Sequence, residues 1–144
     1  MIKNKLKTIV YLCRHPRVTL RLLSFSRYGY LNEIGWINSY INKMPIDSFG
    51  RPVPWCTYGY IDFISPRLKK YMSIFEYGLG NSTLFYSDKV KKVTSVEHEK
   101  SWYDSFKNKV NNNSTIYYEF LEKKGYEKAP MRSNSFFDII IVDG

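Results

Sequence analysis

The sequence predicts an α/β fold with an incomplete parallel sheet of about four strands, preceded by a helical N-terminal segment. In the second half of the chain, short apolar runs alternate with helical or polar segments, which is typical of βα units. The expected strands are Ser73–Tyr77, Lys92–Glu97, Thr115–Tyr118 and Phe137–Val142. The expected helices between them are roughly Ser82–Ser87 and Lys100–Lys109, and the form of the connector Lys123–Ser135 is left open.

The first part of the chain is predicted to be helical. Apolar residues recur at helical spacing over Ile2–Cys13 with lysines between them, so we expect a basic amphipathic helix that Pro16 ends. A second helical stretch is expected over Val18–Met44. Gly29 and Gly35 should divide it into shorter pieces.

The segment 47–60 combines prolines and glycines with large aromatic residues, which predicts an ordered loop. Two interpretations remain open: the aromatic side chains cover a pocket, or they fix the loop to the core. The residues proposed to cover a pocket are Trp55, Thr57 and Tyr58. A helix interrupted near Pro66 should follow over Ile61–Tyr71.

Length and composition fit one globular domain with a single core. The chain has 144 residues, of which 44% are hydrophobic and 17% aromatic, so large multidomain enzymes and whole-chain disorder are excluded. We divide it into a basic helical extension (1–46), an aromatic loop with a helix (47–72) and the α/β core (73–144).

Positive charge is concentrated at the N-terminus. The chain has a formal net charge of +9, and residues 1–27 contain seven Lys and Arg but no acid. This leader either lies on an anionic membrane surface or packs on its own domain with solvated lysines. Nucleic acid is not the expected partner, because there is no zinc-finger spacing and no aromatic RNA-binding motif.

The two cysteines, Cys13 and Cys56, lie far apart and match neither a redox pair nor a metal-ligand spacing, which favours a reducing compartment. No apolar run reaches the roughly 18–20 residues that span a bilayer, and no signal-peptide cleavage site follows the first helix. The expected location is the cytoplasm, either free or peripheral at the inner face of the membrane.

The residues with chemical potential follow three of the expected strands. Gly78 and Gly80 form a turn between a buried strand and a helix, where glycine allows unusual backbone angles and close approach of a ligand. Ser82 or Thr83 should cap that helix. Glu97 ends the next strand, about where nucleoside-binding α/β folds place the acid that binds ribose. Asp143 follows the last strand at the same edge.

These motifs resemble the class I S-adenosylmethionine-dependent methyltransferases, which have a Rossmann-like fold. The resemblance covers about Ser73 to Gly144, through Glu76-Tyr77-Gly78-Leu79-Gly80, Glu97 and the last strand with Asp143-Gly144. A looser resemblance connects the chain with bacterial methyltransferase-like proteins of surface-polysaccharide loci. Its residues are Gly35-Trp36, Asp47, Gly50, Pro52, Pro54-Trp55, Thr57-Tyr58 and Ser95-Val96-Glu97-His98.

The resemblance implies S-adenosylmethionine as cofactor and methyl transfer to an oxygen or nitrogen of a small molecule or sugar. It implies that Glu76 orients the glycine loop or the cofactor's amino group, that Glu97 binds the ribose hydroxyls and that His98 lies near the adenine. It also makes Asp143 the candidate catalytic residue, and we assign no metal site. The residues implied to contact the cofactor are Glu76, Tyr77, Gly78, Gly80, Asn81, Ser82, Thr83, Glu97 and His98.

The chain departs from the family pattern in one respect. The family's sheet has seven strands, whereas this sequence stops after the fourth, so we expect a C-terminally truncated, inactive fragment unless a partner or a second copy covers the strand over 137–142. Two other functions remain open: an NAD(P)-dependent oxidoreductase, and a non-enzymatic module that binds membrane surfaces. Thr83 stands where the dinucleotide fingerprint has its third glycine, which disfavours the oxidoreductase.

Overall fold

The computed structural model describes residues 2–121, 125–133 and 136–142, and divides the chain into two compact units, Met1–Gly50 and Arg51–Gly144. Every buried hydrophobic side chain among the described residues belongs to the second unit.

Helices make up the first unit, as predicted. They are α1 (Ile2–Arg14), α2 (Pro16–Tyr28), α3 (Tyr30–Glu33) and α4 (Trp36–Asn42). Pro16 stands in the first turn of α2, where its missing N–H costs no helical hydrogen bond. Gly29 and Gly35 separate the later helices, which confirms their predicted role.

Gly35 also permits a close approach of two segments. Its φ is 85°, and a Cβ added there would lie 2.2 Å from the backbone carbonyl carbon of Asp47. The hydroxyl of Ser39 secures the same contact from the middle of α4: it donates to the carbonyl of Ile46 (2.7 Å) and accepts from the Ile46 amide (2.9 Å). The segment after α4 is thus held against that helix.

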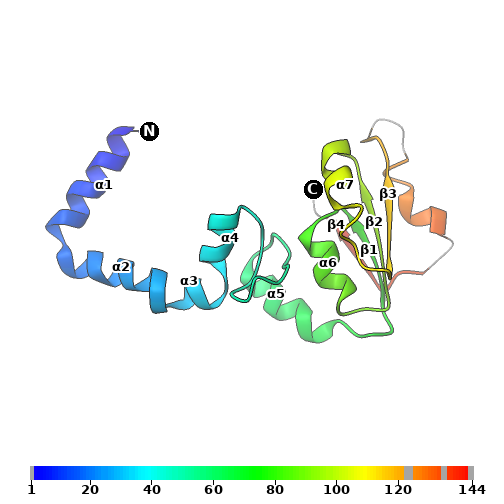
Figure 1. The fold of residues 1–144 in the computed structure, drawn as a ribbon, viewed down its shortest axis with the longest axis horizontal. Coiled ribbons are helices and arrows are strands. Elements are labelled where there is room, and N and C mark those ends of the chain that lie inside the picture. The colour runs from blue at the N-terminus through cyan, green and yellow to red at the C-terminus, as the bar shows by residue number, and fades with distance from the viewer. Residues whose placement is uncertain (1, 122–124, 134–135, 143–144) are drawn as a thin grey trace. The chain divides into compact units, whose positions relative to one another are not determined.

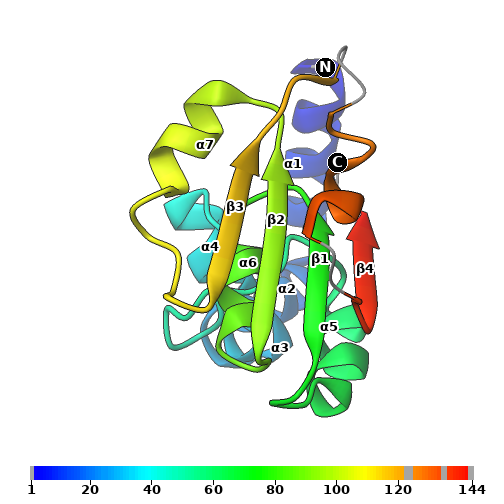
Figure 2. The same ribbon diagram turned by 90° about the vertical axis from the view of Figure 1, so that its right-hand side faces the viewer.

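The second unit is an α/β structure with an all-parallel sheet, in agreement with the predicted fold class. Its strands are β1 (Ser73–Tyr77), β2 (Lys92–Glu97), β3 (Ser114–Tyr118) and β4 (Ile139–Val142), in the order β3-β2-β1-β4 (Figure 2). The helical elements are α5 (Tyr58–Ile64), the 3₁₀ helix η1 (Ser65–Arg67), α6 (Asn81–Ser87), α7 (Lys100–Phe106) and the 3₁₀ helix η3 (Ala129–Ser133). In Figure 1, α6 and α7 lie on one face of the sheet and η3 lies on the other.

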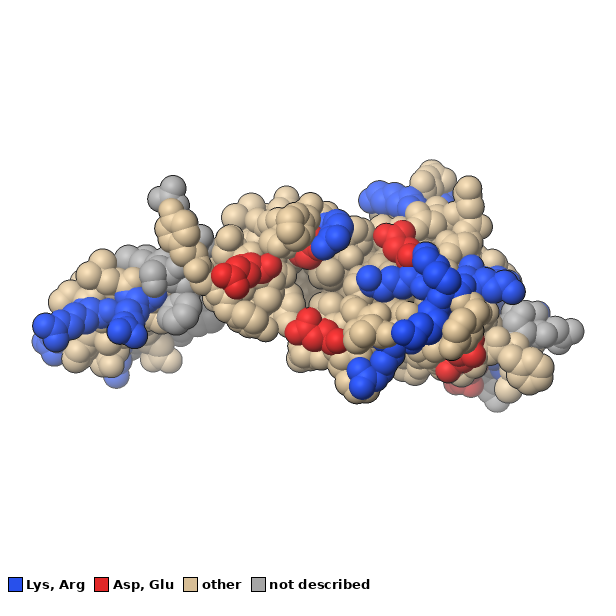
Figure 3. All heavy atoms as spheres, turned by 90° about the horizontal axis from the view of Figure 1, so that it is seen from below, with Lys and Arg blue, Asp and Glu red and all other residues tan. Residues whose placement is uncertain are grey.

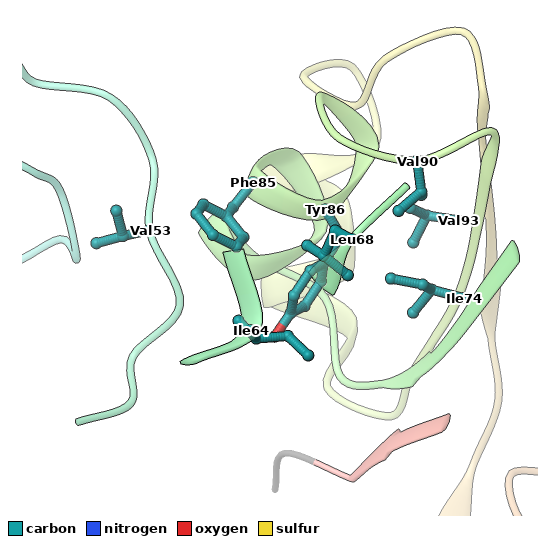
Figure 4. Packing of buried hydrophobic residues seen from close by; sticks show 8 residues of the cluster. All are labelled: Val53, Ile64, Leu68, Ile74, Phe85, Tyr86, Val90 and Val93. Carbon is teal, nitrogen blue, oxygen red and sulfur yellow. The ribbon is translucent and has the colours of Figure 1, made fainter. Parts of the chain in front are cut away.

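Two clusters of buried side chains hold these layers together. Ile74 and Val93 point from the sheet toward Phe85 and Tyr86 of α6, and Ile64 and Leu68 close the same cluster (Figure 4). On the opposite face, the cluster contains Phe75, Val96 and Ala129, packed against Tyr126 and Phe137. Burying an aliphatic or aromatic side chain of this size stabilises the fold by about 1.5–3 kcal/mol.

One side of β4 is open in the described part of the chain. The strand pairs with β1 in the register Tyr77↔Val142, and Ile139 and Ile141 pack against the first cluster. Ile140 and Val142 point to the other face and are 55% and 76% exposed. The sequence-based expectation of an open apolar edge at this strand is confirmed.

Candidate functional site

The loop Gly78–Gly80 connects β1 to α6 at the carboxyl edge of the sheet. Gly78 has a φ of 119°, in a region that side-chain-bearing residues rarely adopt, and its amide donates to the carbonyl of Val96 (2.8 Å). Gly78 therefore adopts the unusual backbone angles that the sequence predicted for this turn.

Gly80 differs from Gly78. Its backbone is extended, with a φ of 172°, so the prediction that both glycines serve unusual angles is wrong here. A Cβ at Gly80 would find Trp102 as its nearest neighbour, with Nε1 3.7 Å away, which is an ordinary van der Waals distance. No close contact among the described residues thus accounts for glycine at position 80.

A buried network of polar side chains from β1, β2 and α6 lies next to this loop. Glu76 Oε2 accepts hydrogen bonds from the hydroxyls of Thr83 (2.6 Å) and Ser95 (3.0 Å), and all three residues are fully buried. Thr83 in turn accepts from the amide of Gly80 (3.1 Å). Glu76 therefore orients the loop through Thr83.

The expected helix cap takes a different form. Gly80 is the residue before α6, and Thr83 stands three positions later, where its hydroxyl accepts the Gly80 amide. Gly80 is the N-cap residue, and Thr83 caps the helix from the third position by accepting the Gly80 amide, so the predicted capping role falls to Thr83. Asn81, Ser82 and Thr83 are all buried in the first turn of α6.

Glu97 connects the loop to the end of β2. Its Oε2 accepts from the amide of Leu79 (3.2 Å), and its Oε1 accepts from the amides of His98 and Glu99 (both 2.8 Å). The side chain is buried. A carboxylate offers about four acceptor positions, so a hydroxyl donor added by a ligand would have to share this group with three backbone amides.

Aromatic residues border the other side of the same edge. The His98 ring lies 5.6 Å from the ring of Tyr126, which packs against Tyr77 at 5.2 Å. The Tyr77 hydroxyl donates to the carbonyl of Glu127 (2.9 Å). Burial raises the pKa of Tyr126, and the Glu97 carboxylate raises it further, so this hydroxyl remains a proton donor at neutral pH.

Sequence reasoning missed three residues of this site. Trp102 of α7 donates its indole N–H to the carbonyl of Leu79, and Tyr126 packs beside His98. No local pattern identifies these two, because both reach the site from elements distant in sequence. Ser95 could have been found, since strand alternation places it on the same side of β2 as Glu97.

The remaining predicted residues lie elsewhere or outside the described residues. Thr57 accepts from the amide of Tyr60 and caps α5, Tyr58 is the first residue of that helix, and Trp55 is largely exposed. Their role in covering a pocket stays a prediction. Asp143 lies outside the described residues.

The sheet order gives this edge a further property. The chain leaves β1 toward β2 and β3 on one side, and the connection after β3 returns to β4 on the other side of β1, with Tyr77 paired to both Val96 and Val142. In open α/β sheets, ligands bind at such a switch point outside the carboxyl ends of the strands. The glycine loop and Glu97 lie at that position.

Comparisons with known proteins were made for the whole chain. No family model, no curated protein and no solved structure matches it. Within the described ranges, no three His, Cys, Asp or Glu side chains gather closely enough to hold a metal ion. None of the helices that the structure describes is both long and apolar enough to cross a bilayer.

Proposed function

We propose that the carboxyl edge of the sheet binds S-adenosylmethionine. We further propose that the protein is a methyltransferase that acts on an oxygen or nitrogen of a small molecule or sugar. The observation that carries the proposal is Gly80. Its backbone is extended, and among the described residues a Cβ there would meet only Trp102 at van der Waals distance, which supports a ligand close to the loop as the reason for glycine.

The surrounding residues suit such a ligand. Glu97 supplies a negatively charged acceptor beside the loop, and Tyr126 and His98 supply aromatic surface on the other side. S-adenosylmethionine brings a methyl group on a sulfonium, and methyl transfer depends chiefly on holding the acceptor in line with it. This chemistry needs no nucleophilic side chain from the protein.

An NAD(P)-dependent oxidoreductase is the weaker alternative. The dinucleotide fingerprint uses its third glycine for close packing of the helix on the sheet. Thr83 occupies that position, and its hydroxyl connects Glu76 with the amide of Gly80. A glycine there would lose both hydrogen bonds. The motif is thus built around a threonine.

We place the enzyme in the cytoplasm, peripheral at the inner face of the membrane. Support for this placement comes from the exposed cysteines Cys13 and Cys56, which favour a reducing compartment, and from the concentration of positive charge in residues 1–27.

Isothermal titration calorimetry of the full chain with S-adenosylhomocysteine tests the proposal, with NAD as the matched ligand control. We expect saturable binding of S-adenosylhomocysteine alone. Gly80→Ala should weaken it about tenfold or more, or about 1.4 kcal/mol, while the thermal midpoint stays unchanged. The matched variant is Gly59→Ala, where a Cβ would meet open space away from the loop. It should bind like the wild type.

Gly80→Ala is a sharper probe than Glu97→Ala. Removing the Glu97 carboxylate also leaves three backbone amides without their acceptor, so its effect on binding mixes loop disorder with loss of a ligand contact. The proposal is overturned if the folded wild type binds no S-adenosylhomocysteine, if NAD binds in its place, or if Gly80→Ala and Gly59→Ala bind equally well.

A further inference from the structure

An apolar stripe on α1 faces solvent. Ile9 and Val10 each lie three or four residues from both Leu6 and Cys13, so the four side chains lie on one side of the helix. Leu6 is 64% exposed and Ile9 is 56% exposed, and Val10 and Cys13 are exposed as well. The rest of the unit Met1–Gly50 does not cover these side chains. Packing within this unit therefore does not account for the stripe.

Positive charge borders this stripe on both sides. At about 100° per residue, Lys5 lies roughly a quarter turn to one side of the stripe, and Lys7 and Arg14 lie about as far to the other side. Arg17 and Arg21 continue the charge along α2, and residues 1–27 contain no acid. In Figure 3, the α1 and α2 portion at the left shows blue side chains and no red ones on the face in view.

A second copy of α1 and a nucleic acid would each use only part of this surface, which combines an apolar stripe with positive charge. A second copy of α1 could pack its stripe against the first, since the spacing of Leu6, Ile9 and Cys13 matches a coiled-coil seam. Such a pair would bring Lys5 of both copies beside the seam with no acid in residues 1–27 to balance it, and it would leave the charges of Lys7 and Arg14 outside the contact. A nucleic acid would use the cations and leave the apolar stripe in water.

We propose that α1 binds the surface of an anionic lipid bilayer, with Leu6, Ile9 and Val10 at the boundary of the acyl chains and the lysines and arginines against lipid phosphates. An anionic membrane surface satisfies the apolar stripe and both charged borders at once. Val18 and Leu22, four residues apart on α2, are exposed as well. This inference is independent of methyl transfer.

Co-sedimentation of the full chain with lipid vesicles tests the proposal. We expect binding to vesicles in which roughly one third of the phosphatidylcholine is replaced by phosphatidylglycerol, and little binding to phosphatidylcholine alone. Added salt should weaken the binding, because it screens the charged contacts. Equal binding to both kinds of vesicle would contradict the proposal.

Paired variants separate the two contributions. Lys5→Gln/Lys7→Gln should weaken binding on the order of tenfold or more, since each cation near the surface contributes a few-fold. The charge-matched control Lys69→Gln/Lys70→Gln alters two exposed lysines of the second unit and should bind as the wild type does. Leu6→Gln/Ile9→Gln keeps all charges and should also lose binding. Retained binding in either α1 variant would overturn the proposal.

The cysteines allow the docking face to be identified directly. An environment-sensitive dye on Cys13 in a Cys56→Ser chain should shift to the blue when vesicles bind, because Cys13 belongs to the stripe. The same dye on Cys56 in a Cys13→Ser chain should not shift. An unchanged Cys13 spectrum would exclude insertion of the stripe.

Two further outcomes would assign the surface to another partner. Sedimentation equilibrium without lipid would reveal a dimer that Leu6→Gln/Ile9→Gln dissociates, if the stripe binds a second copy. Binding to duplex DNA that survives Leu6→Gln/Ile9→Gln, together with no binding to vesicles, would identify a nucleic-acid surface. Either result overturns the membrane proposal.

Discussion

The helices of Met1–Gly50 and the sheet of Arg51–Gly144 use their apolar residues in opposite ways. In the second unit, Ile74, Phe75 and Val93 are fully buried between layers. In the first unit, Leu6 and Leu20 are mostly exposed. Local hydrogen bonds, such as the one from Thr19 Oγ1 to the carbonyl of Leu12 (2.6 Å), hold its helices in place. The chain thus combines a unit built around a core with a unit in which many of the described apolar side chains are exposed.

The largest difference should appear in the free energy of unfolding. Phe75→Ala removes a fully buried ring that packs against Tyr77 and Phe137, and it should cost about 3–5 kcal/mol. Leu6→Gln removes an exposed side chain and should change the free energy by about 0.5 kcal/mol or less. Urea denaturation followed by circular dichroism measures both. Similar losses in the two variants would break the comparison.

A smaller effect should separate buried from exposed carboxylates. Glu76→Gln keeps one oxygen that can accept from the hydroxyls of Thr83 and Ser95, but it removes the negative charge that strengthens both buried hydrogen bonds. We expect a loss of about 1–3 kcal/mol in the same denaturation experiment. Glu33→Gln on the exposed helix α3 is the control and should have almost no effect. A neutral Glu76→Gln would mean that the network beneath the loop is dispensable.

Alkaline pH should reveal the buried tyrosines of the second unit. Burial, together with the hydrogen bond to Tyr60, raises the pKa of Tyr86 far above its usual range, so only the unfolded state ionises this group readily. The free energy of unfolding should therefore be fully present below about pH 10 and fall as the pH rises above it. Tyr86→Phe should show a shallower decline, whereas Tyr40→Phe in the first unit, at an exposed site, should follow the wild type. Identical profiles for all three chains would contradict this assignment.

The smallest effect concerns the exposed face of α7. Asp104 contacts Lys107 (2.8 Å) and Lys100 (3.0 Å), and these hydrogen bonds hold the pKa of its carboxyl below the usual range. Any stabilisation from this group is lost as the pH falls through that lowered pKa. Exposed ion pairs contribute little, so Asp104→Asn should leave unfolding at neutral pH unchanged. Titration of the side-chain carboxyl by NMR checks the pKa directly, and a midpoint in the ordinary aspartate range would refute the contact.

The strands were predicted well where the local pattern determines them. The bounds of β1 and β2 agree with the sequence-based prediction to the residue, because each is a short apolar run with turn residues on both sides. β4 begins at Ile139 instead of Phe137. Before it, Phe137 packs its ring on Phe75, and Asp138 Oδ2 accepts from the amide of Ser73 (2.7 Å). The start of β4 therefore depends on contacts with β1, about 65 residues earlier in the chain. These contacts cannot be predicted from the spacing of residues around β4.

The site shows the same division. Gly78, Gly80 and Glu97 were identified from their places at strand ends, where parallel topology brings them to one edge. The contact of Trp102 with Leu79 was not, because it depends on how α7 packs beside the loop. The sequence-based division set a helical extension over 1–46 apart from the rest, and the first compact unit ends at Gly50.

The position of β1 in the sheet has a consequence during translation. β1 lies between β2 and β4, yet about sixty residues separate its end from the start of β4. At about 5–20 residues per second, a ribosome needs several seconds to synthesise that interval. During this time one edge of β1, with its row of unpaired amides and carbonyls, has no neighbour from its own chain. Nascent chains on a polysome are therefore most exposed to strand exchange and capture by chaperones between the synthesis of β2 and that of β4.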